Sequence, residues 1–455
     1  MKILLIEPAK PLSAIGGEDV FIFEPLALEY VAAGVIDEHE VKILDLRLDK
    51  ELKPTLTEFG PDIVGITAYT LHVNVVKSLF EQIKAWDVNI LTVVGGHHAT
   101  IVPEDFMSPF IDLIVIGEGV FAFKEIVGRF KKGEPFDGIP GVAFAKGNSL
   151  TKTNGQSITD LDAFPFPDRS LTKKYRQYYY SEWMKPLASI RTSKGCPYRC
   201  KFCAQWKMAE GRYLKRNPER VVEELAGIEE EFVFFADDES LIDASRMTRL
   251  AQLIKEAGIK KRYFLYGRSD TITKHPDLLR DWREVGLERV FVGIEFFRDE
   301  DLAYIRKKST SKDNEQAVRI LHDLGIDVYA SFILRPEFTR TDFTALRKYC
   351  QQLELSYASY AVLTPLPGTD LYQEVRDQLI IHNYDYFDFI HTLLPTTLPL
   401  KEFYTEYHDL YMKGIALNKQ LTFLQKFPLK ELPHLLVKGG RFYRRLKATY
   451  QDYEN

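Results

Sequence analysis

The sequence predicts an α/β protein with two successive regions in which short strands alternate with helices, followed by a helical C-terminal end. Two observations support this prediction. Apolar runs of strand length recur along most of the 455 residues, and segments with apolar residues at helical spacing lie between them. Because 45% of the residues are hydrophobic and 13% are aromatic, the chain can bury cores for two to three domains.

Residues 1–150 form the first region. Their expected strands are the apolar runs at residues 2–6, 41–44, 62–66, 90–94 and 113–116. Helical periodicity lies between these runs, for example in residues 26–36 and 73–86. This alternation predicts a doubly wound parallel sheet, in which ligands bind beyond the carboxyl ends of the strands.

Turn residues gather beyond three of these strands, in residues 65–70, 95–100 and 117–119. Glycine at such positions lets the backbone approach a flat or phosphate-bearing ligand closely. Taken alone, this pattern is expected of any doubly wound domain. The candidate ligand contacts are Thr67, Thr70, Gly95, Gly96, Thr100, Gly117, Glu118 and Gly119.

Three cysteines lie close together at Cys196, Cys200 and Cys203, and the fourth, Cys350, lies far downstream. Structural zinc sites take four ligands, and iron–sulfur clusters are commonly held by four thiolates, so three thiolates leave a metal position open. A zinc site completed by a remote histidine and a disulfide with one spare thiol are the alternatives. None of the ten histidines falls within or just after the triplet, and four cysteines in 455 residues indicate a reducing compartment.

The triplet resembles the cluster motif of the radical S-adenosylmethionine (SAM) superfamily. The spacing is Cys-x3-Cys-x2-Cys, with Phe202 before the last cysteine and Lys-Gly before the first. The resemblance implies that the three cysteines hold a [4Fe–4S] cluster and that SAM chelates its fourth iron, beside Phe202. It also implies reductive cleavage of SAM to methionine and a 5′-deoxyadenosyl radical, with electrons from an external donor such as flavodoxin or ferredoxin.

Residues 187–380 form the second region of alternation. Its expected strands are residues 188–192, 232–236, 263–266, 290–294, 328–334 and 358–363. Six strands fit the partial (β/α)6 barrel that the resemblance implies. The cysteines follow the first strand, at the C-terminal mouth where barrel sites form.

Polar residues end the later barrel strands, and the resemblance places three of them near SAM. Asp237 follows the second strand, where a carboxylate could accept a hydrogen bond from the SAM amino group. Arg268 follows the third strand, and Glu295 closes a Gly-x-Glu motif expected near the SAM ribose or carboxylate. The alternative is that these charges solvate strand ends. Residues 332–338 lack both glycines usual in the family, whereas residues 363–372 match the end of its barrel.

With this motif downstream, the first region resembles the flavodoxin-like cobalamin-binding domain of cobalamin-dependent radical SAM enzymes. The resemblance rests on residues 95–100 and 112–119. The Asp-x-His-x-x-Gly motif, whose histidine binds cobalt in many cobalamin enzymes, is absent after the first strand. His72, His97 and His98 are candidates for a lower cobalt ligand, and a hydrogen-bonding or surface role is the alternative for each.

The two cofactors together imply a radical SAM, cobalamin-dependent methyltransferase that acts on an unactivated carbon. One SAM would methylate cobalamin and a second would supply the radical. The aromatic content, the basic C-terminal segment and the range of the family favour an apolar polycyclic substrate, either a hopanoid-type lipid or a tetrapyrrole. One alternative is an oxidative cyclase or ring-rearranging enzyme of the anaerobic tetrapyrrole cyclase type, without methyl transfer. Another is a cluster-bearing sensor that binds cobalamin without catalysis.

Residues 151–186 are expected to link the two regions, and Pro165 and Pro167 exclude a helix through residues 162–168. Residues 381–455 are expected to form a helical extension. Its last part, from Leu421, combines apolar residues with basic ones, and such a segment can bind an anionic membrane surface. The alternative is a solvated helix that closes the barrel. The basic residues are Lys438, Arg441, Arg444, Arg445 and Lys447.

Composition and charge exclude other classes. No stretch approaches ~18 consecutive apolar residues, so a transmembrane span is not expected. A net charge of −5 provides no general case for nucleic-acid binding. An oxygen-sensitive cluster fits a reducing cytoplasm.

Overall fold

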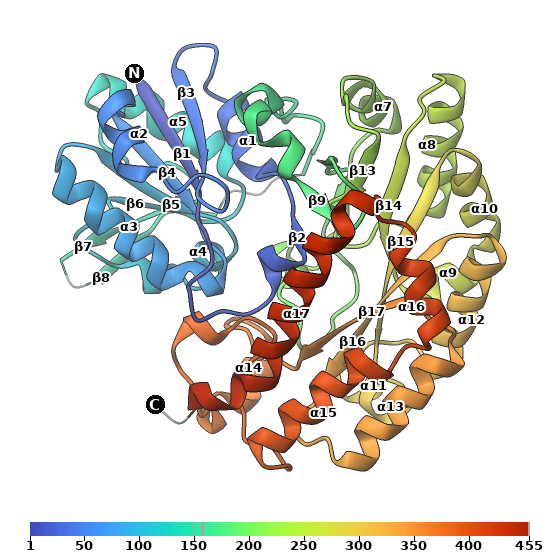
Figure 1. Ribbon diagram of the computed structural model, residues 1–455. Helices are drawn as coiled ribbons and strands as arrows, with labels where there is room; N and C mark the ends of the chain where they lie inside the picture. The colour runs from blue at the N-terminus through green and yellow to red at the C-terminus, as the bar shows by residue number, and fades with distance from the viewer. Residues whose placement is uncertain (148, 156–158, 454–455) are drawn as a thin grey trace. The chain divides into compact units, whose positions relative to one another are not determined.

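The computed structural model describes residues 1–147, 149–155 and 159–453 (Figure 1). The chain divides into two compact units. The first comprises Met1–Ala14, Phe23–Tyr179 and Asn383–Phe387, and the second comprises Ile15–Ile22, Tyr180–His382 and Asp388–Asn455. The expected linker therefore divides at Tyr179, and its residues 156–158 lie outside the described residues.

The first unit contains a seven-stranded sheet in the order β3-β1-β4-β5-β6-β7-β8. Its parallel part contains all five predicted strands, which confirms the doubly wound sheet; two antiparallel strands, β7 and β8, extend it. The bounds are β1 (Lys2–Glu7), β3 (Glu40–Asp45), β4 (Ile63–Thr67), β5 (Leu91–Gly95), β6 (Leu113–Val115), β7 (Val142–Lys146) and β8 (Ser149–Lys152).

Strand β1 shows why this sheet needs helices on both faces. Leu4 and Ile6 enter one hydrophobic core and Ile3 and Leu5 enter another, because successive side chains of a strand point to opposite faces. Helices α2 (Leu52–Phe59) and α3 (Val73–Trp86) contribute to the first core. Helices α1 (Leu26–Ala33) and α5 (Gly119–Lys132) contribute to the second.

The second unit contains six parallel strands that pair in chain order from β10 to β17, which confirms the predicted partial barrel. Helices α8 (Ala244–Glu256), α10 (Pro276–Glu284), α12 (Ser311–Asp323) and α13 (Arg340–Gln352) cover the outer face of the strands (Figure 1). The strands are β10 (Leu187–Ile190), β13 (Phe232–Phe235), β14 (Arg262–Gly267), β15 (Leu287–Glu295), β16 (Asp327–Leu334) and β17 (Tyr357–Val362).

A fully buried arginine lies at the amino ends of the barrel strands. Arg289 pairs with Glu182 at 2.6 Å and with Asp327 at 3.3 Å, and its guanidinium lies 4.6 Å from the Tyr329 ring. Paired carboxylates offset the cost of burying the charge. Lys426, which follows helix α16 (Leu417–Leu424), reaches the same Asp327 at 2.6 Å.

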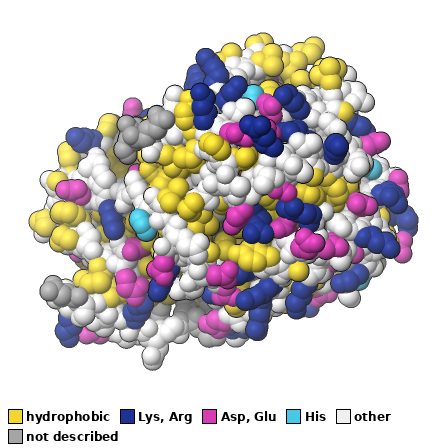
Figure 2. Space-filling model, turned by 90° about the horizontal axis from the view of Figure 1, so that it is seen from below, with side chains coloured by type: hydrophobic (Ala, Val, Ile, Leu, Met, Phe, Trp, Pro, Cys, Tyr) yellow, Lys and Arg dark blue, Asp and Glu magenta, His cyan; other side chains and the backbone are white. Residues whose placement is uncertain are grey.

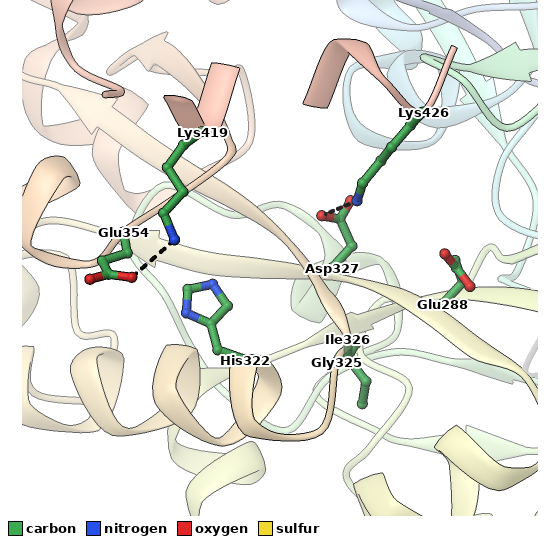
Figure 3. A pocket seen from close by; sticks show the side chains of 8 residues that line it. All are labelled: Glu288, His322, Gly325, Ile326, Asp327, Glu354, Lys419 and Lys426. Carbon is green, nitrogen blue, oxygen red and sulfur yellow. Dashed lines mark hydrogen bonds and ion pairs between the residues drawn. The ribbon is translucent and has the colours of Figure 1, made fainter. Parts of the chain in front are cut away.

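An open pocket of about 360 Å³ lies beside this network (Figure 3). It lies at the amino ends of β15 and β16, whereas Cys196, Cys200 and Cys203 follow the carboxyl end of β10. Two ion pairs cross the pocket, Lys426 with Asp327 and Lys419 with Glu354. We therefore assign these residues to fastening the C-terminal segment rather than to the cluster site.

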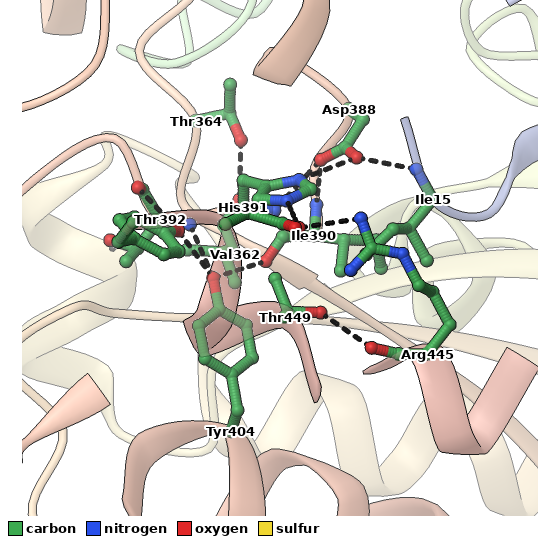
Figure 4. Close-up of polar contacts among 12 residues, drawn as sticks. Ile15, Val362, Thr364, Asp388, Ile390, His391, Thr392, Tyr404, Arg445 and Thr449 are labelled. Atoms are coloured by element: carbon green, nitrogen blue, oxygen red, sulfur yellow. Dashed lines mark hydrogen bonds and ion pairs between the residues drawn. The ribbon is translucent and has the colours of Figure 1, made fainter. Parts of the chain in front are cut away.

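The chain ends in the predicted helices, here α15 (Leu400–Lys413), α16 and α17 (Leu432–Ala448). A buried polar cluster holds this end in place (Figure 4). His391 lies between Asp388 and Asp452, with each ring nitrogen 2.9 Å from a carboxylate oxygen. Asp388 also accepts a hydrogen bond from the Ile15 backbone N–H at 2.8 Å.

This histidine predicts a pH-dependent contribution to stability. Burial alone would lower the pKa of His391, but hydrogen bonds and charge from Asp388 and Asp452 outweigh it, so the pKa is raised above its usual 6.5. The stabilisation is therefore fully present below about pH 6.5 and is lost as the pH rises through the folded-state pKa. We expect His391→Gln to lower the free energy of unfolding in urea more at pH 6 than at pH 9. An equal loss at both values would contradict this.

No helix within the described residues is both long enough and apolar enough to span a bilayer. On the face drawn in Figure 2, basic and acidic side chains are interspersed over most of the surface. Hydrophobic side chains also gather at its upper edge, next to a group of Lys and Arg side chains.

Candidate active site

The predicted cluster cysteines lie in the loop between β11 (Ser193–Lys194) and helix α6 (Gln205–Met208). Gly195, which precedes the first cysteine, has φ +85°, and a Cβ there would lie 2.1 Å from the Arg212 carbonyl oxygen. Only glycine fits this close approach. The Gly195 N–H donates to Asp238 at 2.6 Å, and the Trp206 indole donates to the Cys200 carbonyl at 3.1 Å. The loop is therefore fixed at both ends.

The three thiols lie near enough for their charges to interact. Burial raises the pKa of Cys196 to about 11 and that of Cys203 to about 12, and charge on the neighbouring cysteines adds to both shifts. Such thiols need bound metal to become thiolates. Within the described residues, no three His, Cys, Asp or Glu side chains converge on a single ion position. A [4Fe–4S] cluster fits, because it binds each thiolate at a different iron.

Arg268, predicted from sequence, lies against this loop. Its guanidinium is 3.5 Å from the Tyr198 ring centroid, and its Nη1 lies 3.9 Å from the Cys200 sulfur. Nε donates to Asp270 at 2.9 Å, and Nη2 donates to the Lys307 carbonyl. These contacts hold a buried positive charge beside the Cys200 thiol. The sequence analysis did not identify Tyr198 or Asp270 as partners of Arg268. The position of Asp270, two residues after Arg268, could have indicated an ion pair.

Asp237 faces the start of the loop. Its carboxylate accepts from the backbone N–H of Thr192 at 2.7 Å, from that of Ser193 at 2.8 Å and from the Thr192 hydroxyl at 2.7 Å. It is 2% exposed. Three internal donors occupy its two oxygens, so in this geometry Asp237 positions the end of β10 and the residues that lead to Cys196.

Glu239, two residues further on, was not predicted. One of its oxygens accepts from the Arg268 N–H at 3.2 Å, and the other is buried with no hydrogen-bond partner among the described residues. Burial raises the pKa of Glu239 to about 8, which favours the protonated carboxyl group.

Glu295 ends strand β15 with φ +63°, in the left-handed region that favours glycine. Its carboxylate pairs with Lys307 at 2.7 Å. A Cβ at Gly293 would lie 2.6 Å from that carboxylate and 2.8 Å from the Lys307 Nζ, so a side chain there would displace this ion pair. A strained residue of this kind persists only where its surroundings hold it, often at a functional site. Phe202 is partly exposed in the cysteine loop.

The carboxyl edge of the first unit brings together the predicted loops after β4, β5 and β6. The Ala68 N–H donates to the Gly95 carbonyl at 2.9 Å, and the Thr100 hydroxyl donates to the Gly96 carbonyl at 2.9 Å. The Gly117 N–H donates to the same Thr100 hydroxyl at 3.0 Å. Thr67 ends β4, Glu118 is the N-cap of helix α5, and Gly119 is the first residue of that helix.

Gly96 is the point of closest approach among these loops. It has φ +99°, and a Cβ there would lie 2.6 Å from the Thr67 hydroxyl and 2.7 Å from the Ala68 backbone nitrogen. The missing side chain is therefore required by packing between the loops. It also leaves bare backbone at the edge where a ligand of a doubly wound sheet binds.

The three candidate histidines differ in availability. His98 is buried, with Nδ1 3.1 Å from the Thr70 hydroxyl and Nε2 2.8 Å from Asp105, so both nitrogens are engaged and Thr70 positions this ring. His97 stacks on Tyr69 with ring centroids 4.7 Å apart. His72 is buried with Nδ1 unpartnered within the described residues. Burial and then the charge of Arg47 lower the pKa of His72 to about 4.

Comparison with known proteins relates each of the two units to a known domain family. A B12 binding domain model matches residues 12–127, and a radical SAM superfamily model matches residues 190–350. The chain is 31% identical over 414 residues to hopanoid C-3 methylase from Methylococcus capsulatus. The matched region covers 89% of this chain and 78% of that relative. The chain belongs to the cobalamin-dependent radical SAM methyltransferase family.

This methyltransferase is also 28% identical over 442 residues to the anaerobic magnesium-protoporphyrin IX monomethyl ester cyclase of Cereibacter sphaeroides, covering 92% of the chain and 72% of that relative. Its fold matches the radical SAM methyltransferase TsrM from Kitasatospora setae with a TM-score of 0.66 and 22% identity, over 83% of this chain and 75% of that one. The cofactors of the methyltransferase are a [4Fe–4S] cluster, SAM and cobalamin, as its sequence predicts.

Proposed function

We propose that this methyltransferase transfers a methyl group to an unactivated carbon of an apolar polycyclic substrate, either a hopanoid-type lipid or a tetrapyrrole. The observation that carries the proposal is the 31% identity to hopanoid C-3 methylase over 89% of the chain. The cysteine loop supports it, because it offers three thiols and leaves a cluster iron open to SAM. When bound, the cofactors supply hydrogen-atom abstraction and the methyl group.

The residues around the cluster loop then have distinct proposed roles. Cys196, Cys200 and Cys203 bind the cluster, and Asp237 orients the loop through Thr192 and Ser193. Arg268 holds positive charge and an N–H beside Cys200, and hydrogen bonds to cluster sulfurs help to set the reduction potential.

Two carboxyl groups are proposed as polar contacts for SAM. Glu295 presents a carboxylate from a strained strand end, and Lys307 holds it in place. Glu239 offers a buried carboxyl oxygen that has no hydrogen-bond partner among the described residues. Arg268 and Phe202 remain proposed neighbours of SAM from their place in the sequence motif.

The linked loops of the first unit are proposed to line the cobalamin site, with Gly96 at the point of closest backbone approach. Asp105 and Thr70 engage His98, which disfavours it as a cobalt ligand, and no protein ligand to cobalt is proposed. We also propose that an external flavodoxin or ferredoxin supplies the electrons. The proposed contacts are Thr67, Thr70, Gly95, Gly96, Thr100, Gly117, Glu118 and Gly119.

A second candidate is oxidative ring formation without methyl transfer, favoured by the 28% identity to the magnesium-protoporphyrin cyclase. Methyl-deuterated SAM separates the two candidates. With anaerobically reconstituted enzyme, reductant, cobalamin and either a hopanoid or a magnesium porphyrin, we expect mass spectrometry to find an intact CD3 group in the product. Turnover to an unlabelled product would overturn methyl transfer and favour the cyclase.

A further inference from the structure

The C-terminal helices of the second unit expose a series of large apolar side chains. Helix α16 exposes Leu417 by 71% and Leu421 by 52%, the following turn exposes Leu429 by 84%, and helix α17 exposes Leu436 by 66% and Val437 by 62%. Scattered single apolar residues on a surface are ordinary, but five within such a short segment are not.

Basic residues accompany the exposed apolar residues on helix α17. Helix α17 contains five lysines and arginines and no aspartate or glutamate, in a chain whose net charge is −5. Arg441, Arg444 and Lys447 are exposed and follow Leu436 and Val437 at helical spacing, so they lie along the same side of the helix. Across residues 412–447, the exposed residues that the structure describes include no acidic side chain.

The opposite sides of both helices are already packed. In α17, Leu446 is fully buried and the Tyr443 ring lies 5.6 Å from that of Tyr411 on α15. Arg445 pairs with Asp452 at 2.6 Å. Lys419 pairs with Glu354 at 2.9 Å and thereby ties α16 to the barrel. The exposed apolar residues therefore do not belong to an unfinished contact with the core of their own unit.

We propose that the basic-apolar face of helix α17, defined by Leu436, Val437, Arg441, Arg444 and Lys447, docks on an anionic lipid bilayer. Leucine and valine side chains would enter the boundary between headgroups and acyl chains, and the cations would attract anionic headgroups. The purpose of such docking rests on the proposed function, because a hopanoid-type substrate is a lipid that a bilayer would present to the enzyme.

Vesicle flotation of the full-length protein tests this proposal. We expect about tenfold more protein to float with vesicles of phosphatidylcholine and phosphatidylglycerol than with phosphatidylcholine alone, and high salt to reduce the difference. Leu436→Ser with Val437→Ser should abolish flotation, and Arg441→Gln with Arg444→Gln should remove the preference for anionic lipid. Point variants are preferable to truncation, because Asp452 and Tyr453 contact His391 and Tyr404 inside the fold.

Matched controls come from the first unit. Val88→Ser removes another apolar side chain, which is 71% exposed. Lys131→Gln with Lys132→Gln removes two charges from helix α5. Both controls should float like the unaltered protein. Equal flotation of all variants, or negligible flotation of the unaltered protein, would overturn the proposal.

Light scattering of the same proteins in solution tests whether a second copy of the chain, rather than lipid, covers this face. A dimer that the leucine and valine substitutions dissociate, without flotation of either form, would assign this face to a second copy of the chain and overturn the lipid proposal. SAM-dependent formation of 5′-deoxyadenosine is measured in parallel. Flotation is measured without turnover. A protein that fails to transfer methyl groups can therefore still show whether helix α17 binds anionic lipid.

Discussion

Replacing Cys200 by alanine is expected to abolish cluster binding and, with it, all formation of 5′-deoxyadenosine. Cys200 is buried, its carbonyl accepts a hydrogen bond from the Trp206 indole, and the backbone N–H of the next residue, Lys201, donates to the Ile305 carbonyl. Arg268 directs an N–H to the Cys200 sulfur. The loop supplies three thiols for four irons, and the fourth cysteine, Cys350, lies far away in the chain, so loss of one thiol leaves the cluster with too few thiolate anchors. Iron and sulfide content after anaerobic reconstitution, with electron paramagnetic resonance of the reduced protein, measures the loss.

Cys350 provides the matched control. It is fully buried on helix α13, where the Tyr360 hydroxyl donates to its sulfur at 3.5 Å. Cys350→Ala should reduce the free energy of unfolding by about 1 kcal/mol through a small cavity and a lost hydrogen bond, and leave iron content unchanged. Full iron content in Cys200→Ala, or equal loss in both variants, would contradict the assignment of the triplet.

Replacing Gly96 by alanine is expected to lower cobalamin affinity by at least tenfold and destabilise the first unit. The new methyl group would lie 2.6 Å from the Thr67 hydroxyl and 2.7 Å from a backbone nitrogen, at a residue with φ +99°. Backbone cannot rotate away as a flexible side chain can, so the loops after β4 and β5 must separate. Strain at such a position costs on the order of 1–3 kcal/mol. Absorbance titration with hydroxocobalamin measures the affinity.

Gly128 separates this effect from glycine replacement in general. It lies inside helix α5 with open space around the position of a Cβ. Gly128→Ala should stabilise the unit by about 0.5–1 kcal/mol and leave cobalamin affinity unchanged. Wild-type affinity in Gly96→Ala would show that cobalamin does not depend on the close approach of these loops.

Much of the fold could be predicted because local patterns determine it. Strands such as 2–6 and 328–334 are apolar runs of strand length bounded by turn residues, and their predicted bounds lie within a residue or two of β1 and β16. The cysteine triplet is equally local, since its spacing along one loop carries the prediction. The antiparallel strands β7 and β8 were not predicted, because their short, half-exposed sequences lack a distinctive pattern.

The sequence alone was sufficient for the order of the parallel strands, the prediction of the three cysteines as cluster ligands and the family, because each depends on residues that are near one another in the chain. Only the tertiary structure could show that Asp237 holds the cysteine loop, that Arg268 reaches Cys200 and that Asp105 and Thr70 engage His98. It also showed that Glu239 is buried with one oxygen that no described residue hydrogen-bonds. Most of these contacts join different strand ends, and their geometry depends on how parallel strands bring those ends to one edge of a sheet.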